Sequence, residues 1–332
     1  MLAGYRVTQL LGRGGMGEVW AGTDSTGAQV AIKVLLPSVA LQPDAVARFK
    51  REAHVSAAIS SPHVCRLVEH TNDPETGSNV LVFERLVGET LAERLERDGY
   101  LSFAEVGWIL SDALRGLVDA HACGVIHRDL KPSNLFIEWL GRPERPERAK
   151  VLDFGISKRT EHRDDEPSLT DFGQTLGSVT YMAPEQIRAA ATVDERADVY
   201  GIGAVAFRAL SGRLPFEAQN IGILVALKLD RPAPTLAEVT QDQWPRRLEE
   251  FLATALAGKP EDRFASAQEA FEAWQAILPQ GVIHREQRPP ERSAAAFDDD
   301  QTVMESPVTH ESETTDRKWP GDIWDGGPTE GG

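Results

Sequence analysis

The chain has 332 residues, 51 of them acidic and 35 basic, and its formal net charge is −16 at pH 7. Such an acidic chain argues against general nucleic-acid binding, because phosphate backbones attract basic surfaces, and any nucleotide site must be locally basic. The two cysteines, Cys65 and Cys123, lack metal-ligand spacing and are too few for a disulfide framework, so we expect small buried hydrophobes in a reducing compartment.

The apolar runs and the N-terminus do not indicate a membrane or secreted protein. The first residues lead straight into a strand-like segment without a basic-then-apolar leader. The longest apolar run, residues 199–210, contains Arg208 and is shorter than the ~20 residues that a bilayer span needs. We therefore expect a cytoplasmic protein with no membrane span.

Hydrophobic periodicity divides the chain into three parts: residues 1–86, 87–280 and 281–332. The first part has short β-branched runs broken by Gly and Asp and one helical stretch, residues 44–59, which predicts a small sheet carrying one helix. Helical periodicity dominates the second part. The third is rich in Pro, Ser, Thr and acidic residues, and from residue 285 it holds 12 acidic and 5 basic side chains, so we expect a disordered tail.

Two Ser-x-x-Glu boxes predict helix starts in the second part. Ser102 with Glu105, and Ser266 with Glu269, can satisfy the free amide donors at a helix N-terminus. A small sheet followed by a larger helical region predicts an α+β fold of two lobes.

A glycine-rich run lies near the N-terminus, and its residues are Gly12-Arg13-Gly14-Gly15-Met16-Gly17-Glu18-Val19. In the pattern G-x-G-x-x-G-x-V, glycines let backbone amides approach phosphates without interference from a Cβ atom. These glycines lead into a strand-like run, whereas those of a dinucleotide-binding fold lead into a helix. We predict a glycine-rich hairpin over a nucleotide, and an ordinary structural turn is the alternative.

A cation and a carboxylate are predicted to meet in the first part. Residues 30–33 form an apolar strand that ends in Lys33, and a lone lysine there usually only extends its ammonium into water. In the following helix, however, Glu52 lies within the apolar stripe of Phe49 and Ala53, where a carboxylate needs a partner. A Lys33–Glu52 pair would hold the ammonium against the α- and β-phosphates of ATP. A purely structural Glu52 is the alternative.

Two charged motifs lie between apolar runs: His127-Arg128-Asp129-Leu130-Lys131-Pro132-Ser133-Asn134 and Asp153-Phe154-Gly155. Transfer of a γ-phosphoryl group needs little covalent help, so Asp129 would mainly orient the attacking hydroxyl and take its proton late, while Lys131 meets phosphate. Asn134 and Asp153 supply the hard oxygen ligands that Mg²⁺ prefers. The motifs predict a phosphoryl-transfer site for ATP and Mg²⁺; the alternative is that all are ordinary loop residues.

The order of these motifs resembles that of bacterial Hanks-type (eukaryotic-like) serine/threonine protein kinases, from residue 5 to about residue 278. The resemblance implies the bilobal α+β kinase fold, ATP:protein phosphotransferase activity and protein substrates. A Lys two positions after the catalytic Asp is the arrangement of Ser/Thr kinases, which implies Ser and Thr acceptors. Catalytic roles fall on Asp129, Lys131, Lys33 and Glu52. The implied nucleotide contacts are Leu11, Gly12, Arg13, Gly14, Gly15, Met16, Gly17, Glu18, Val19, Ala31, Lys33, Glu84 and Leu86.

The resemblance also implies several supporting contacts. Residues 183–185, Ala-Pro-Glu, resemble the end of the activation segment, and Arg263 resembles the Arg that pairs with Glu185. Asp198 resembles the residue that anchors the catalytic loop. Phe83 lies at the gatekeeper position, before the adenine-contacting hinge of residues 84–86.

Regulation by autophosphorylation follows from the same resemblance. Arg128 beside Asp129 implies that a phosphate on the activation segment can be bound electrostatically, which would order that loop. The candidate acceptors are Ser168, Thr170 and Thr175.

Three positions depart from the family pattern. Ser178 replaces the usual Thr, although its hydroxyl can still bridge Asp129 and Lys131. Ser56 replaces a larger apolar residue, which would loosen the helix that carries Glu52 and favours regulation over loss of function. Residues 138–150 lengthen the turn before the metal ligand and predict a surface hairpin without a catalytic role.

Two other functions stay open. A pseudokinase would bind nucleotide and signal through its conformation. A docking platform would use the tail, where Asp298-Asp299-Asp300-Gln301-Thr302-Val303 places a Thr beside three acids and could recruit a phosphothreonine-reading partner; a solubilising tail is the plainer alternative. A homodimer is compatible with the resemblance, but no motif demands one.

Overall fold

The computed structural model describes residues 1–15, 17–142, 145–154, 176–188 and 193–278. Several predictions fall outside these residues: nucleotide contact Met16, phosphorylation candidates Ser168, Thr170 and Thr175, and the whole tail with Thr302. The side chain of Ser178 is also outside the description.

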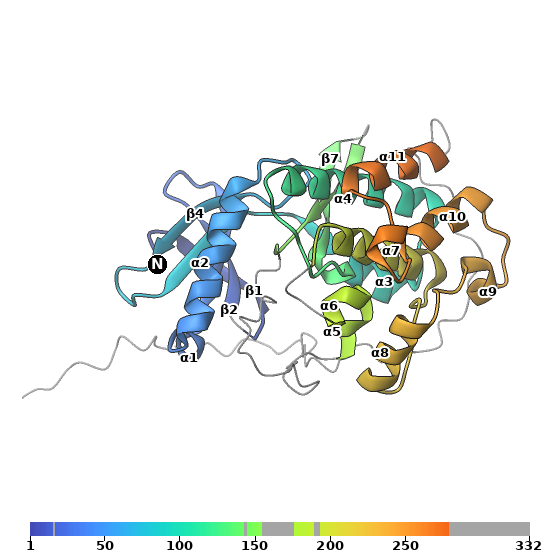
Figure 1. Ribbon diagram of the computed structural model, residues 1–332. Helices are drawn as coiled ribbons and strands as arrows, with labels where there is room; N and C mark the ends of the chain where they lie inside the picture. Colours follow the sequence, from blue (N-terminus) through green and yellow to red (C-terminus); the bar gives the residue numbers. More distant parts are fainter. Residues whose placement is uncertain (16, 143–144, 155–175, 189–192, 279–332) are drawn as a thin grey trace, which may run out of the picture.

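The N-terminal lobe is a five-stranded antiparallel sheet in the order β1-β2-β3-β5-β4 (Figure 1). Its strands are β1 (Arg6–Arg13), β2 (Gly17–Thr23), β3 (Gln29–Leu35), β4 (Leu67–Asn72) and β5 (Asn79–Glu84). The chain crosses from β3 to β4 through a short helix, α1 (Pro37–Ala40), and a long one, α2 (Pro43–Ala58). The predicted small sheet with one principal helix is therefore present.

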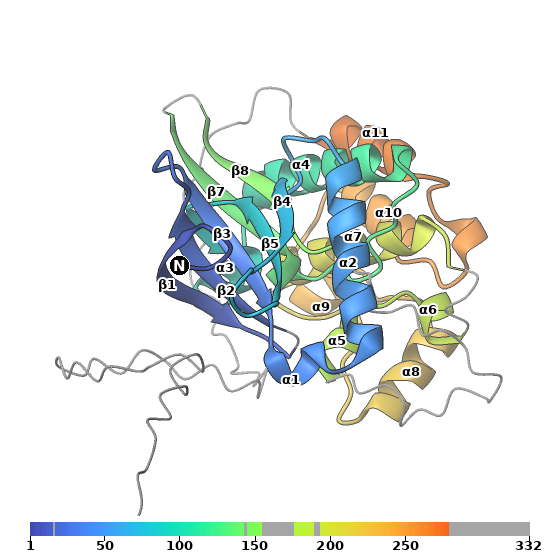
Figure 2. The same ribbon diagram turned by 90° about the vertical axis from the view of Figure 1, so that its left-hand side faces the viewer.

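Helix α2 lies beside the sheet because its apolar stripe packs against it (Figure 2). Phe49 and Ala53 on the helix are buried with Leu35 of β3 and Leu81 of β5. Burying apolar side chains of this size contributes about 1.5–3 kcal/mol for each large one. Glu52 lies between these positions in the sequence, so the stripe places its carboxylate on the side of the helix that faces Lys33 in β3.

The C-terminal lobe is mainly helical. Its longer helices are α3 (Leu91–Asp98), α4 (Phe103–Ala122), α7 (Arg196–Ser211), α8 (Ile221–Asp230), α10 (Arg246–Ala255) and α11 (Ala267–Ile277). Shorter helices are α5 (Leu176–Tyr181), α6 (Pro184–Arg188), α9 (Leu236–Thr240) and the 3₁₀ turns η1 (Pro132–Asn134) and η4 (Pro260–Asp262). A three-stranded sheet of β6 (Gly88–Thr90), β7 (Leu135–Arg142) and β8 (Arg145–Val151) lies at the edge toward the first lobe.

Helix α7 occupies the centre of this lobe. Almost all of its residues are buried, as expected of a helix that is apolar all round and surrounded by other elements. It contacts α4, α9, α10 and α11. Trp274 of α11 is fully buried near it, with its indole nitrogen 2.9 Å from the carbonyl of Gly107 in α4. Among the described residues, no helix is both long and apolar enough to cross a membrane.

The local predictions hold in most places. Ser102 and Glu105 form the full capping box at the start of α4, and β7 pairs with β8 as the expected hairpin at residues 138–150. Ser266 caps α11, but the carboxylate of Glu269 accepts the amide of Ala265 at 2.7 Å and does not complete the predicted box.

The expected burial of the cysteines is wrong. Cys123 is exposed and Cys65 is half-buried, and both are free thiols. Cys123 follows directly after α4, where the chain turns at the surface, and its thiol donates to the carbonyl of Ala58 at 3.3 Å. At the end of a helix the chain turns at the surface, so packing against other elements does not require a small apolar residue there to be buried.

Candidate active site

The centre of the site is a lysine that contacts both lobes. Nζ of Lys33 in β3 lies 2.6 Å from Oε1 of Glu52 in α2, which is the pairing expected from the sequence. The same nitrogen lies 3.2 Å from Oδ1 of Asp153, which follows β8 of the other lobe. One ammonium group therefore holds the helix, the sheet and the predicted metal ligand in a single arrangement.

Each of these three groups has a shifted pKa. Burial by itself would lower the pKa of Lys33, but the carboxylates of Asp153 and Glu52 outweigh burial and raise it above the usual value. The Lys33 ammonium holds the pKa of Asp153 below the usual range. Burial raises the pKa of Glu52 although Lys33 opposes this. Lys33 is thus a fixed positive charge at neutral pH, as a phosphate contact requires.

The catalytic loop, residues 127–134, brings three predicted residues together. Nζ of Lys131 lies 3.5 Å from Oδ2 of Asp129. Nδ2 of Asn134 donates to the backbone carbonyl of Asp129 at 2.8 Å and approaches its carboxylate at 3.4 Å. The Asp129 side chain is 16% exposed, so it is held by its neighbours and still reached by solvent.

A buried carboxylate in α7 holds this loop by accepting hydrogen bonds from its backbone. Asp198 is 1% exposed, and it accepts the backbone amides of His127 and Arg128 at 2.8 Å each. Nε2 of His121 in α4 donates to the same carboxylate at 2.8 Å. The role implied for Asp198 by the resemblance is therefore matched by its contacts.

Two hydrogen bonds orient the ring of His127 and select one tautomer. It is fully buried, and its Nε2 lies 2.8 Å from the carbonyl of Leu152, which can only accept, so Nε2 carries the proton. Its Nδ1 lies 3.2 Å from the amide of Asp129, which can only donate, so Nδ1 is unprotonated. The ring also packs on Phe154 with ring centroids 4.9 Å apart. His127 therefore ties the loop to the segment that ends in Asp153.

Two site residues have strained backbones. Arg128 has φ of 63° and Asp153 has φ of 41°, in the left-handed region that non-glycine residues seldom adopt. Such conformations cost about 1–3 kcal/mol each and persist only where surrounding contacts impose them. Here the contacts are those of Asp198 with the Arg128 amide and of Lys33 with Asp153.

The glycine-rich run forms the predicted hairpin between β1 and β2, in which Arg13 pairs with Glu18. Gly17 has a structural reason to be glycine, because a Cβ atom there would lie 2.4 Å from the carbonyl oxygen of Val34. Nε of Arg13 donates to Glu18 at 2.8 Å, and Nε1 of Trp20 donates to the other carboxylate oxygen at 3.0 Å. The side chain of Glu18 is thus used in shaping the hairpin.

The other predicted nucleotide contacts lie on strands of the same sheet or just after them. Val19 pairs with Lys33 across β2 and β3, Ala31 pairs with Phe83 across β3 and β5, and Glu84 pairs with Val30. The carboxylate of Glu84 forms an ion pair with the buried Lys150 of β8, a contact that the sequence did not indicate. Leu86 is buried, and its carbonyl accepts from Arg85 at 2.9 Å.

The residues present suit a divalent metal ion held partly by phosphate. The backbone of Asn134 accepts the amide of Leu152 at 2.8 Å, which places Asn134 next to Asp153. Among the described residues, no group of three His, Cys, Asp or Glu side chains could hold a metal. Mg²⁺ usually takes only one or two carboxylates and completes its shell with water and substrate phosphates. Asn134 and Asp153 fit this coordination preference. The Asp153 side chain is 57% exposed, so its carboxylate can be reached from solvent.

An ion pair stabilises the far side of the site. The guanidinium of Arg263 donates to both carboxylate oxygens of Glu185 at 2.7 and 2.8 Å, which is the implied pairing. One residue on, Nε2 of Gln186 donates to the carbonyl of Arg128 at 2.8 Å. The contact of Gln186 was not predicted, because nothing in the local sequence marks a glutamine that reaches a loop 58 positions away.

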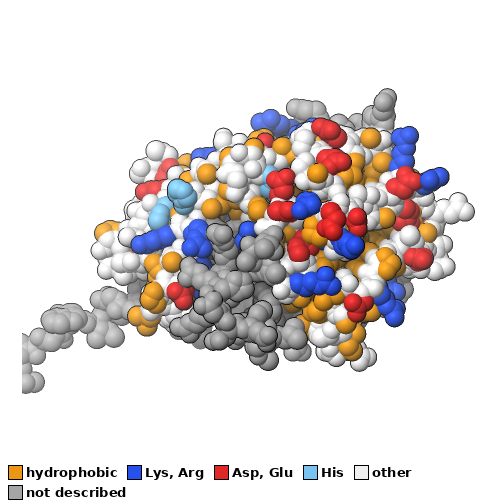
Figure 3. Space-filling model, viewed as in Figure 1, with side chains coloured by type: hydrophobic (Ala, Val, Ile, Leu, Met, Phe, Trp, Pro, Cys, Tyr) orange, Lys and Arg blue, Asp and Glu red, His pale blue; other side chains and the backbone are white. Residues whose placement is uncertain are grey.

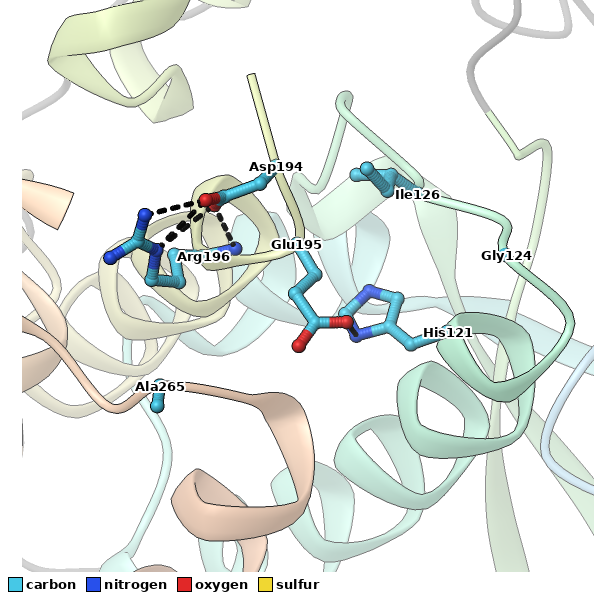
Figure 4. Close-up of a pocket in the computed structure, with 7 residues that line it drawn as sticks. All are labelled: His121, Gly124, Ile126, Asp194, Glu195, Arg196 and Ala265. Carbon is cyan, nitrogen blue, oxygen red and sulfur yellow. Dashed lines mark hydrogen bonds and ion pairs between the residues drawn. The ribbon is translucent and has the colours of Figure 1, made fainter. Parts of the chain in front are cut away.

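A separate pocket of about 400 Å³ lies behind the catalytic loop (Figure 4). Its lining residues are His121, Gly124, Ile126, Asp194, Glu195, Arg196 and Ala265. The Glu195 carboxylate lies beside the His121 ring, 3.6 Å from Nδ1, and Asp194 pairs with Arg196. No predicted nucleotide or metal residue lines this pocket, so it is distinct from the site around Lys33.

The face in Figure 3 carries charges of both signs. Over the helical lobe, basic side chains are interspersed with acidic ones, and no continuous basic surface is seen among the described residues of that face. The two lysines of the candidate site, Lys33 and Lys131, are each paired with carboxylates.

Comparison with known proteins agrees with this geometry. Residues 5–274 match the family model described as protein kinase domain. The chain is 37% identical to serine/threonine-protein kinase pkn3 of Myxococcus xanthus, over 81% of this chain and 49% of the relative. It is 33% identical to serine/threonine-protein kinase PknA of Mycobacterium tuberculosis, over 79% of this chain and 58% of the relative. The chain thus spans about half the length of these relatives.

A solved structure has the same fold. The crystal structure of the Mycobacterium tuberculosis PknI kinase domain superimposes with a TM-score of 0.62 at 28% identity, over 83% of this chain and 97% of that domain. This likeness agrees with the small sheet lobe and the larger helical lobe described above. The chain belongs to the protein kinase family, as a member of its bacterial Hanks-type serine/threonine group.

Proposed function

We propose that this chain is an ATP-dependent serine/threonine protein kinase of bacterial signalling, which transfers the γ-phosphoryl group of ATP to Ser or Thr hydroxyls of proteins. The observation that carries the proposal is the contact of Lys33 with both Glu52 and Asp153 across the two lobes. Phosphoryl transfer depends almost entirely on positioning and electrostatic stabilisation, and this contact supplies both.

Each residue would then have a defined task. Lys33, held by Glu52, binds the α- and β-phosphates, and the backbone of the glycine-rich hairpin covers them. Asp129 orients the substrate hydroxyl and accepts its proton. Lys131, 3.5 Å from Asp129, offers positive charge to the transferred phosphoryl group and supports a Ser or Thr acceptor.

Family membership implies ATP and a divalent metal ion as cofactors. We propose Mg²⁺, because Asn134 and Asp153 offer hard oxygen ligands and few of them. When bound, Mg²⁺ would neutralise charge on the phosphates. The two residues themselves are kept in place by the Leu152 amide, the Lys33 ammonium and the Asp129 carbonyl.

Further parts of the proposal rest on the sequence. We propose a cytoplasmic protein with lobe boundaries near residues 86 and 280, and autophosphorylation on the activation segment. A homodimer and a phosphothreonine-reading partner at the tail also stay predictions. Every predicted catalytic and metal-binding residue lies within the described part of the chain, and nothing there favours a pseudokinase over a kinase.

The test is incorporation of radiolabelled phosphate from ATP in the presence of Mg²⁺, by the purified wild-type chain and by Asp129→Asn. The surface substitution Asp230→Asn makes the same change of charge at an exposed position and serves as the control. We expect label on Ser and Thr in the wild type and in the control, and a loss of about 10²-fold or more in Asp129→Asn.

A wild type that binds ATP but labels neither itself nor a generic protein acceptor would overturn the kinase proposal in favour of a nucleotide-binding scaffold. Label in Asp129→Asn at the wild-type rate would overturn the role of Asp129.

A further inference from the structure

Helix α8 contains a buried lysine that no part of the phosphoryl-transfer chemistry uses. Lys228 is only 2% exposed, one turn after the buried Leu224 on the same side of the helix. Lysine is almost never fully buried unless it is paired. Its Nζ donates to the backbone carbonyl of Val179 at 3.1 Å and to that of Met182 at 2.6 Å.

The two carbonyls belong to the segment that connects the activation region to the Ala-Pro-Glu motif. Val179 lies in α5, and its side chain is buried with Leu224 of α8 and with Phe216. Helix α8 therefore touches this segment in two ways, through apolar side chains and through the ammonium of Lys228. The apolar contacts alone would leave the Met182 carbonyl in a buried setting with no partner among the described residues.

The same segment continues to the catalytic loop. The amide of Ala183 donates to Oε1 of Gln186 at 3.0 Å, and Nε2 of Gln186 donates to the carbonyl of Arg128 at 2.8 Å. Arg128 immediately precedes Asp129. A short series of hydrogen bonds therefore connects Lys228, by way of residues 182–186, to the backbone beside the predicted catalytic carboxylate.

We propose that Lys228 is a positioning residue for the protein substrate: its buried ammonium fixes the backbone of residues 179–182, against which the acceptor segment of the substrate must lie to reach Asp129. The part of this inference that concerns a protein substrate rests on the proposed kinase function. Its geometry rests on the hydrogen bonds of Lys228 described above. In the proposed function ATP binds around Lys33, a residue that these hydrogen bonds do not involve, so we expect the effect of Lys228 to fall on the protein substrate.

The contact also makes substrate binding sensitive to pH near neutrality. Burial, followed by the nearby guanidinium of Arg263, lowers the pKa of Lys228 to about 7, whereas Glu185 acts in the opposite direction. Among the described residues, the charged or titratable groups that face Lys228 are these two and Tyr200, whose ring centroid lies 5.1 Å from Nζ. Above neutral pH the amine loses its charge and one of its three donors, and charge-assisted bonds are about twice as strong as neutral ones.

The test compares wild type with Lys228→Met, which keeps an unbranched apolar stem and removes the ammonium. Lys259→Met, at an exposed position of the same lobe, is the matched control. KM for a protein acceptor, KM for ATP and kcat are measured between about pH 6 and pH 8.5. Hydrogen exchange of the backbone amides is followed in all three proteins without nucleotide, which needs no catalytic activity.

We expect Lys228→Met to raise KM for the protein acceptor about tenfold at pH 6, the effect of losing one charge-assisted hydrogen bond, with KM for ATP unchanged. The ratio of variant to wild-type KM should fall toward about twofold by pH 8.5, because the wild type has by then lost its charge. Amides of residues 179–187 should exchange at least about tenfold faster in the variant, with α7 and α10 unchanged.

Unchanged exchange at residues 179–187 would overturn the proposal whether or not the protein has kinase activity. An equal loss in both KM values and in kcat, with faster exchange throughout the lobe, would overturn it in favour of a general structural role. A wild type without phosphoryl transfer would refute the kinase function and with it the role in substrate binding, and exchange would then report on the backbone contact alone.

Discussion

Nζ of Lys33 lies 3.2 Å from Oδ1 of Asp153, although 120 positions separate the two residues in the chain. Lys33 lies in β3 of the N-terminal sheet, and Asp153 follows β8 of the helical lobe. This charge pair joins the two lobes, and the proposed phosphoryl transfer needs such an arrangement because it depends on positioning. Because Lys33 also contacts Glu52, the same group of contacts includes helix α2.

Glu52→Gln should separate nucleotide binding from phosphoryl transfer. Lys33 would lose its closest carboxylate and be drawn toward Asp153 alone, so we expect kcat to fall about 10- to 100-fold while the affinity for ATP changes little. Phosphate incorporation and nucleotide binding by fluorescence are the two measurements. Glu96→Gln, at an exposed position of α3, controls for loss of one charge. A parallel fall in affinity and kcat would contradict this separation.

Asp198→Asn should weaken the hydrogen bonds that hold the backbone of the catalytic loop. The carboxylate accepts three hydrogen bonds, from the amides of His127 and Arg128 and from His121, and an Asn side chain turns a donor toward one of them. We expect a loss of about 2–4 kcal/mol in the free energy of unfolding and at least about 10²-fold in kcat. Urea unfolding and phosphate incorporation measure the two, with Asp230→Asn as control. An active, fully stable variant would show that the loop does not depend on Asp198.

Glu185→Gln should lower the free energy of unfolding of the helical lobe. The loss should be smaller than when a fully buried member of an ion pair is removed. Arg263 has a fully buried side chain, while Glu185 is 18% exposed, and Arg263 keeps the carbonyls of Ala257 and Arg196 as partners. Breaking a fully buried pair costs about 3–5 kcal/mol, so we expect about 2–3 kcal/mol here. Thermal and urea unfolding give the value. Glu261→Gln is the exposed control, and a loss no larger than in this control would mean that the pair contributes nothing.

Lys228 predicts a specific dependence of stability on pH. Its pKa is about 7 in the folded protein and 10.5 when unperturbed, so between these values the unfolded chain binds the extra proton and the folded state gains stability as pH rises. The free energy of unfolding of wild type, relative to Lys228→Met, should be constant below pH 7 and rise by up to about 1.4 kcal/mol per pH unit above it. Urea unfolding from about pH 6 to pH 9 measures this difference. A flat difference over that range would show that Lys228 titrates normally.

The sequence by itself predicts the chemistry of the candidate site. Lys33 at a strand end, Glu52 inside an apolar helical stripe, and Asp129, Asn134 and Asp153 in two charged motifs were all found from residue type and spacing. These signals are local, because helical and strand periods decide which side chains share a face, and because phosphate and Mg²⁺ demand particular donor atoms. The α+β fold followed from the same periodicity, and only local details such as the Glu269 cap differed.

The tertiary structure alone decided which distant groups meet and which are buried. In the folded chain Lys33 contacts Asp153, and Nε2 of His127 donates to the carbonyl of Leu152. Glu84 pairs with the buried Lys150, and Cys123 lies at the surface. The tertiary structure also buried Lys228, although a lysine is almost never fully buried unless it is paired. Burial and partner choice depend on the packing of elements that are far apart in the chain, and the energy of a charge depends on that packing more than on its sequence neighbours.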